Sequence, residues 1–295
     1  MRIGICRGMA RFAGDVDAQY AYLKKLGFDT TDESLCETER PYYASVAAME
    51  EHCKPIREAS EKYGIKVFQV HASFGLWHKK ETWEETYSGI LEILRLGLYG
   101  AHLMGAENYV LHPLFEYGIW VERVYFNSDE AREHTIQCIR DLIPDAEKYG
   151  ITLCLENLPG NNREFFLTKE IAKAVEEINS PYVGICLDTG HAAVNGEDLG
   201  DAVRNCGKHL RCLHTHDNDG ELDQHNLPFF GVIDWGNFTT ALAETGYSGS
   251  ISLEASPYKS RHLTPALREK MEELCLTIVH HLADEVEEKK STVSE

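Results

Sequence analysis

Basic residues are scarce in this sequence relative to acidic ones. Its 295 residues include 29 Lys and Arg but 48 Asp and Glu, which gives a formal net charge of −19 at pH 7. A surface this acidic repels phosphate backbones, and nucleic-acid affinity depends largely on neutralising those phosphates. We therefore expect a small-molecule partner and no nucleic acid.

Long apolar runs and paired cysteines are also missing. No stretch approaches the ~20 apolar residues that a membrane span needs, and no apolar run follows the N-terminal charge of MRIGICRGMA as it would in a signal peptide. The nine cysteines form no CxxC pair, and several fall in predicted strands or helices, where Cys acts as a small buried hydrophobe. These absences predict a reduced, cytoplasmic protein without a membrane segment.

The sequence does contain a regular alternation of short β-rich runs and longer segments with helical periodicity. Most of the β-rich runs follow a Gly or Pro boundary, and they predict strands over residues 2–7, 28–33, 65–71, 108–113, 152–157, 183–188, 210–216 and 250–255. Eight strands with intervening helices predict the α/β class and a single-domain (β/α)8 TIM barrel over residues 1–283, followed by a charged tail at 284–295. The alternative, an open doubly wound sheet, lacks the GxGxxG motif expected after its first strand.

Metal-binding side chains stand at the ends of the last six predicted strands. They are His71, His112, Glu156, Asp188 with His191 three residues on, His214 with His216, and Glu254. Because the C-terminal ends of barrel strands meet at one mouth, these side chains are expected to be neighbours. One such residue alone is more often an ordinary rim or core group. Six strands in succession predict a divalent metal site, and the absence of Cys favours Zn²⁺, Mn²⁺, Fe²⁺ or Co²⁺ over a structural zinc site.

The stretch LHTHDNDGELDQH adds two kinds of candidate. Strand alternation places His214 and His216 on one face, with His214 deeper in the barrel and His216 on the rim. Further along, Asp223 and His225 form a DxH pair that can chelate a metal together or contact a substrate. The sequence leaves these two roles open.

Several motifs resemble those of the xylose isomerase-like barrels: CLENLPG around Glu156, CLDTGH from Asp188 to His191, LHTHDNDG with DQH, GVIDW, and SLEAS around Glu254. The resemblance covers nearly the whole chain. The family includes sugar isomerases and epimerases, inosose-handling enzymes and the endonuclease IV type of apurinic-site endonuclease. In the epimerase branch, it implies one divalent ion (Mn²⁺, Zn²⁺ or Co²⁺) held by Glu156, Asp188, His214 and Glu254.

From this ligand set we expect a mechanism. Glu156 and Glu254 would be the paired base and acid of a proton transfer through an ene-diolate. A small-molecule carbohydrate would meet His71, His112, His191, His216, Asp223 and His225. Aromatic residues of the same loops would cover its apolar faces, or simply pack, with Trp77 and Trp120 preferred over Phe74, Phe115, Phe229 and Phe230. Barrels of this kind often pair, which leaves a homo-oligomer open.

The chain departs from the ketohexose 3-epimerases at two positions that bear on substrate. Asn162 stands where they tend to place Glu, and Gly220 stands where they tend to place Arg. These differences put the transfer of that particular specificity in doubt.

The endonuclease branch is the main alternative. It holds three zinc ions with nine ligands, and this chain offers a candidate for each: His71, His112, Glu156, Asp188, His191, His214, Asp223, His225 and Glu254. The net charge of −19 and the lack of Arg or Lys clusters in the loops argue against it. A keto-sugar lyase or dehydratase would use the same base and metal, and a metal-bound sugar-binding protein would use the same cluster without catalysis.

Overall fold

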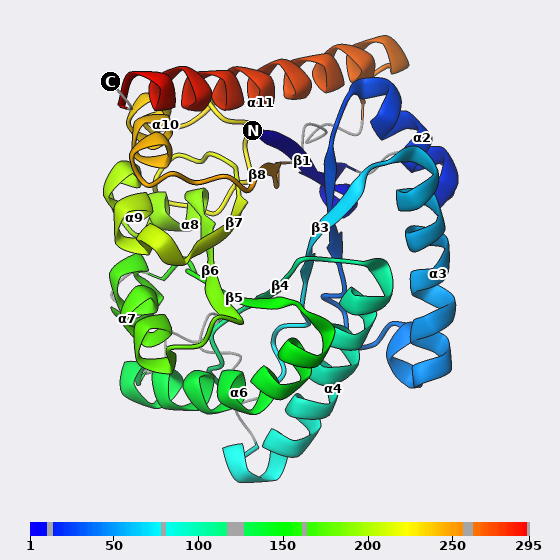
Figure 1. Ribbon diagram of the computed structural model, residues 1–295, viewed down its shortest axis with the longest axis vertical. Helices are drawn as coiled ribbons and strands as arrows, with labels where there is room; N and C mark the ends of the chain where they lie inside the picture. The colour runs from blue at the N-terminus through cyan, green and yellow to red at the C-terminus, as the bar shows by residue number, and fades with distance from the viewer. Residues whose placement is uncertain (11–13, 78–80, 117–126, 161–163, 256–261, 294–295) are drawn as a thin grey trace.

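Eight parallel strands form the centre of the molecule, and helices surround them (Figure 1). The computed structural model describes residues 1–10, 14–77, 81–116, 127–160, 164–255 and 262–293. The strands are β1 (Arg2–Cys6), β2 (Thr30–Ser34), β3 (Lys66–His71), β4 (Asn108–Leu111), β5 (Thr152–Glu156), β6 (Val183–Asp188), β7 (Leu210–His214) and β8 (Ser250–Leu253). Their order in the sheet is β7-β6-β5-β4-β3-β2-β1-β8.

The barrel closes between β7 and β8 through a short seam. Thr215 N–H donates to the Ser252 carbonyl at 2.8 Å, and Glu254 N–H donates to the Thr215 carbonyl at 3.0 Å. These bonds form an isolated parallel bridge between Thr215 and Leu253, just beyond the end of β7. The predicted single-domain (β/α)8 TIM barrel is therefore confirmed.

The helices follow the strands in alternation along the chain. They are α1 (Arg7–Ala10), α2 (Val16–Leu26), α3 (Val46–Tyr63), α4 (Trp83–Met104), α6 (Ser128–Tyr149), α7 (Thr168–Ile178), α8 (Thr189–Val194), α9 (Leu199–Cys206), α10 (Trp235–Glu244) and α11 (Pro265–Val293), with short 3-10 turns at Pro41–Ala44, Glu164–Phe166 and Gly207–His209. Gly64 and Gly150 end α3 and α6 in the left-handed conformation that glycine adopts at least cost. A strand begins two residues after each glycine, as the sequence motifs YGIKVF and YGITLC predict.

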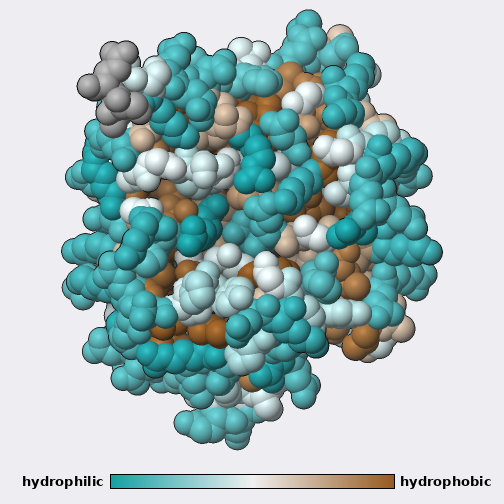
Figure 2. Space-filling model, in the orientation of Figure 1, coloured by the Kyte–Doolittle hydropathy of each residue, from teal (hydrophilic) through white to brown (hydrophobic). Residues whose placement is uncertain are grey.

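Helix α11 extends into the segment that the sequence predicts as a charged tail. It continues to Val293 because Leu282 and Val286 both lie on its buried face. Among the described residues, no helix combines the length and apolar character that crossing a membrane requires. Figure 2 shows a mainly hydrophilic face broken by smaller hydrophobic areas, in keeping with the acidic composition.

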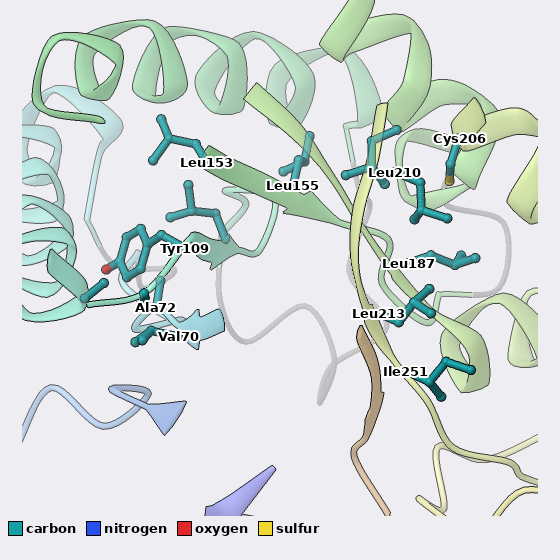
Figure 3. Packing of buried hydrophobic residues seen from close by; sticks show 14 of the residues in the cluster. Val70, Ala72, Tyr109, Leu153, Leu155, Leu187, Cys206, Leu210, Leu213 and Ile251 are labelled. Atoms are coloured by element: carbon teal, nitrogen blue, oxygen red, sulfur yellow. The ribbon is translucent and has the colours of Figure 1, made fainter. Parts of the chain in front are cut away.

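The strands separate two apolar regions. The larger one lies between strands and helices, and Figure 3 shows Tyr109, Leu153, Leu187, Leu213 and Ile251 pointing into it. The smaller one lies inside the barrel and consists of Phe68, Val110, Cys154, Cys186 and Cys212. All nine cysteines are free thiols and eight of them are buried, as expected for Cys used as a small hydrophobe.

The three inner cysteines fix the direction of the residues that follow them. Side chains alternate along a strand, so the residue two positions after each Cys also points into the barrel. Those residues are Glu156 on β5, Asp188 on β6 and His214 on β7. Strand periodicity thus brings three of the predicted ligands to one mouth of the barrel.

Candidate active site

A cavity of about 790 Å³ opens at the C-terminal ends of the strands. This volume is in the usual range for a small-molecule site. Ten of the residues predicted from sequence line it: His71, Phe74, Trp77, His112, Phe115, Glu156, His191, Asp223, His225 and Glu254. Three further candidates, Asp188, His214 and His216, are fully buried and lie against this lining. Trp120 and Asn162 lie outside the described residues.

The four predicted metal ligands come together at the base of the cavity. One donor atom from each of Glu156, Asp188, His214 and Glu254 lies within 4.8 Å of all the others. His214 Nδ1 is 3.0 Å from Glu156 Oε1 and 3.2 Å from Glu254 Oε2. Three largely buried carboxylates repel one another unless a positive charge lies between them. The donor set of three carboxylates and one imidazole therefore fits a divalent ion such as Mn²⁺, Zn²⁺ or Co²⁺.

The two glutamates differ in their electrostatic surroundings. Burial opposes ionisation of Glu156, yet His214 and His112 hold its pKa well below the ordinary value. Burial raises the pKa of Glu254 even though His214 and His225 lie near it. Two carboxyl groups whose pKa values are pushed apart are suited to divide the roles of base and acid.

Each carboxylate oxygen of Asp188 has a polar partner. Its Oδ1 accepts the backbone N–H of His191 at 2.7 Å, and its Oδ2 lies 3.0 Å from His216 Nε2. Burial raises the pKa of Asp188, but His191 and His216 outweigh this and leave the value below normal. His216 contacts this carboxylate and does not line the cavity, so its predicted contact with substrate stays a prediction.

Asn157, which no sequence pattern singles out, fixes the backbone next to Asp188. Its side chain donates to the Asp188 carbonyl at 2.9 Å and accepts the Asp188 N–H at 2.8 Å. Asn157 directly follows Glu156 in the motif CLENLPG, and this adjacency to a ligand was the one available signal.

Three histidines of the cavity share one arrangement. His71, His191 and His225 each donate from Nδ1 to a backbone carbonyl at 2.7 to 2.8 Å, namely those of Ala72, Asn157 and Glu254. This anchor leaves each Nε2 facing a carboxylate: Glu156 at 3.4 Å for His71, and Asp223 at 3.4 Å for His191 and 3.2 Å for His225. A fixed ring with its second nitrogen directed into the cavity is suited to bind a metal or a substrate oxygen.

The DxH pair therefore faces the cavity together with His191. Burial opposes protonation of both histidines, but their carboxylate neighbours prevail. Asp188 and Asp223 raise the pKa of His191 to about 10, and Asp223 and Glu254 raise the pKa of His225 to about 9. The rings of His216 and His225 also stack at 4.0 Å.

The opposite wall carries His112 and aromatic side chains. His112 Nε2 lies 3.3 Å from Glu156 Oε2, and burial lowers the pKa of this histidine. Phe74 stacks on His112 with ring centroids 5.0 Å apart and is exposed at the mouth. Trp77 is nearly buried and donates from Nε1 to the Glu81 carbonyl at 2.8 Å. Phe229 and Phe230 are exposed and do not line the cavity.

Asp32 and Gln69, which the sequence did not single out, lie next to the Nε2 side of the His214 ring. Asp32 on β2 is buried, and its Oδ2 lies 3.0 Å from His214 Nε2. The Gln69 side-chain amide on β3 donates to the same oxygen at 3.0 Å. The available signal was an acidic residue within the β-rich run FDTTDE.

The motif GVIDW is explained by contacts with Asp217. This buried carboxylate accepts Trp235 Nε1–H at 2.9 Å and the N–H groups of Asn218 at 2.9 Å and Ile233 at 3.3 Å. Asp217 also pairs through its backbone with Asn226. These bonds hold both ends of the loop that carries Asp223 and His225.

Comparison with known proteins agrees with the barrel fold. The family model described as "Xylose isomerase-like TIM barrel" matches residues 20–276. The chain is similar to the D-psicose 3-epimerase of Ruminiclostridium cellulolyticum, with 26% identity over 252 residues that cover 81% of this chain and 78% of that protein. It is also similar to the probable endonuclease 4 of Thermoplasma acidophilum, with 21% identity over 207 residues that cover 66% and 69% of the two chains.

A solved structure with the same fold is that of the IOLI protein with a bound zinc atom. It superposes with a TM-score of 0.72 at 19% identity and covers 98% of this chain and 99% of its own.

Proposed function

Because the chain belongs to the xylose isomerase-like TIM barrel family, we propose that it is a divalent-metal-dependent isomerase or epimerase of a sugar, keto-sugar or cyclic polyol. The observation that carries this proposal is the cluster of Glu156, Asp188, His214 and Glu254 at the base of a cavity of about 790 Å³. The similarity to a D-psicose 3-epimerase supports the same class of substrate.

The proposed chemistry divides the work between the metal and the protein. A bound Mn²⁺, Zn²⁺ or Co²⁺ would supply Lewis-acid polarisation of a substrate carbonyl and its neighbouring hydroxyl. Glu156 then takes the proton from the carbon between these groups, because its carboxyl ionises readily. Glu254 returns a proton to the resulting ene-diolate, so that the two glutamates form the base and the acid of the pair.

Other residues would bind and orient the substrate. His191 and His225 present Nε2 to the cavity and donate hydrogen bonds to substrate oxygens, with Asp223 between them as acceptor. His71 and His112 contact the substrate from the opposite wall. Phe74 and Trp77 exclude water from the same side of the cavity.

The test is incorporation of solvent deuterium into a panel of unphosphorylated ketohexoses and keto derivatives of cyclic polyols. The wild-type chain loaded with Mn²⁺, Co²⁺ or Zn²⁺ is expected to exchange one carbon-bound proton next to the carbonyl. Glu254→Gln is expected to keep the fold, checked by circular dichroism, but to lower exchange at least ~100-fold because it removes a proton carrier. Retained exchange in this variant would exclude Glu254 from the acid/base pair.

A matched control is Glu51→Gln, which removes one exposed carboxylate from α3, away from the cavity lining. Exchange should remain at the wild-type rate in this variant.

A second candidate function is phosphodiester hydrolysis at abasic DNA by a three-zinc site. It is favoured by three further groups of donor atoms within 4.8 Å of one another: His71 with Glu156 and His214, Asp188 with His191 and His216, and His216 with Asp223 and His225. The net charge of −19 opposes DNA binding. We expect one ion per chain and no nicking of an abasic duplex; three zinc ions with strand cleavage would replace the epimerase proposal by this one.

A further inference from the structure

His214 differs from the other histidines of the site in how its ring is placed. In His71, His191 and His225, Nδ1 is tied to a backbone carbonyl and Nε2 faces a carboxylate. In His214, Nδ1 faces the ligand cluster, and the nitrogen on the far side of the ring, Nε2, faces the Asp32 side chain at 3.0 Å. No backbone carbonyl bonds either nitrogen of His214 within the described residues. A side-chain carboxylate therefore stands where the other histidines have a carbonyl, and it meets Nε2 as an ion pair at 3.0 Å and not as a hydrogen bond.

Asp32 is itself held in position. The Gln69 amide donates to Asp32 Oδ2 at 3.0 Å and to the Leu213 carbonyl at 3.1 Å. Leu213 directly precedes His214, so one side chain connects the carboxylate to the strand that carries the histidine. Three strands (β2, β3 and β7) thus meet at one contact.

A register shift produces the pairing of Asp32 with Gln69. Along β2 and β3, Thr31 pairs with Val67 and the next residue, Asp32, pairs with Gln69, so that Phe68 is skipped. An irregularity of this kind changes the direction of a side chain and is common near functional sites. It places the Gln69 amide within hydrogen-bond distance of Asp32 Oδ2.

Burial of the Asp32 carboxylate lowers the stability of the fold. Its side chain is 1% exposed, and its second oxygen, Oδ1, accepts no hydrogen bond from the described residues. A buried carboxylate that is only partly satisfied destabilises a fold, so a purely structural role does not explain it. The neighbouring Glu33, in contrast, is fully engaged on the other face of β2 by Arg7 and Tyr20.

We propose that Asp32 is a positioning residue that orients His214 so that Nδ1 binds the metal, and that Gln69 holds Asp32 in place. This inference rests on the proposed metal role of His214. A histidine that binds a metal through one nitrogen commonly directs the other to a carboxylate, which fixes the tautomer and orientation of the ring.

The test is titration of the metal-free full-length chain with Co²⁺, followed by visible absorption. Asp32→Asn is expected to weaken Co²⁺ binding by ~10- to 100-fold and to change the absorption bands, since the ligand orientation changes. Glu33→Gln removes the charge of the adjacent buried carboxylate, on the other face of β2, and is expected to keep the wild-type Kd and spectrum. Wild-type Kd and bands in Asp32→Asn would overturn the proposal.

A second variant keeps the proposal testable if Asp32→Asn does not fold. Gln69→Met removes the anchor of Asp32 and is expected to weaken Co²⁺ binding by a smaller factor, again with altered bands. An unchanged Kd and spectrum in Gln69→Met would overturn the proposal. Failure of the wild-type chain to bind Co²⁺ would instead reject the proposed function itself, so the two failures are distinguishable.

Discussion

Gly190 shows how closely single residues are fitted around the site. It lies in α8, directly beneath the ring of His216, and a Cβ atom at this position would come within 2.0 Å of His216 Cε1. The ring that contacts Asp188 Oδ2 therefore needs a residue without a side chain at position 190. The motif CLDTGH contains this glycine because of a close approach and not because of a turn.

We predict that Gly190→Ala displaces His216 and frees Asp188. The expected result is a loss of ~1–3 kcal/mol in the free energy of unfolding through overpacking, together with weaker divalent metal binding. Chemical denaturation and a metal titration measure the two effects. In the control Gly89→Ala, on the exposed side of α4 with nothing within 4 Å, the change should stabilise by ~0.5–1 kcal/mol. Wild-type stability in Gly190→Ala would contradict the packing argument.

At the scale of elements, two register shifts bring the site together. One, between β2 and β3, pairs Asp32 with Gln69. The other lies between β6 and β7, where Ile185 pairs with Leu210 and Cys186 pairs with Cys212, so that Arg211 is skipped. As a result Asp188 pairs with His214, and two predicted ligands stand side by side.

These shifts mark the limit of what the sequence predicts. The strands follow from β-rich runs after Gly or Pro, and a metal site at the mouth follows from strand ends that meet there. The choice of Glu156, Asp188, His214 and Glu254 as its ligands follows from the resemblance to the epimerase branch. Asp32 and Gln69 could not be found in this way, because their meeting depends on a bulge. A bulge changes the pairing partner without leaving a sequence pattern, and FDTTDE and IKVFQVH look like ordinary strands.

The loop after β7 depends on Asp217 for its shape. We predict that Asp217→Asn lowers the free energy of unfolding by ~1–3 kcal/mol, because an amide cannot accept all three N–H groups that the buried carboxylate accepts. Denaturation followed by Trp fluorescence measures this, since Trp235 loses its Nε1–H partner. The control Asp219→Asn changes an exposed carboxylate of the same loop and should have a much smaller effect.

At the scale of the whole molecule, negative charge is concentrated at the site as well as on the surface. The chain carries a net charge of −19, and the cavity contains several carboxylates that its histidines face. Among the described residues that line the cavity, histidines are the ones that can carry positive charge when no metal is bound. Stability of the metal-free chain should follow their protonation.

We predict that the metal-free chain loses stability between pH 7 and pH 10. Folding raises the pKa of His191 to about 10 and that of His225 to about 9. The stabilisation is complete below the unfolded-chain pKa of about 6.5 and is lost as the pH rises through the folded values. Thermal unfolding in the presence of a chelator should show a falling Tm over this range.

The control for this pH dependence is His225→Asn, since asparagine tolerates the positive φ of 47° at this position. Its Tm should fall less steeply with pH than that of the wild-type chain. Equal slopes in the two proteins would assign the pH dependence to other groups.

The proposed metal would also stabilise the seam of the barrel between β7 and β8. Backbone pairing between β7 and β8 depends on the short bridge at Thr215, so the ring of strands can open there at lower cost than elsewhere. His214 stands on one side of this seam and Glu254 on the other. A cation bound by these two side chains would connect the two ends of the sheet, β7 and β8, directly. Loss of the ion would then increase local opening and amide hydrogen exchange at this one junction.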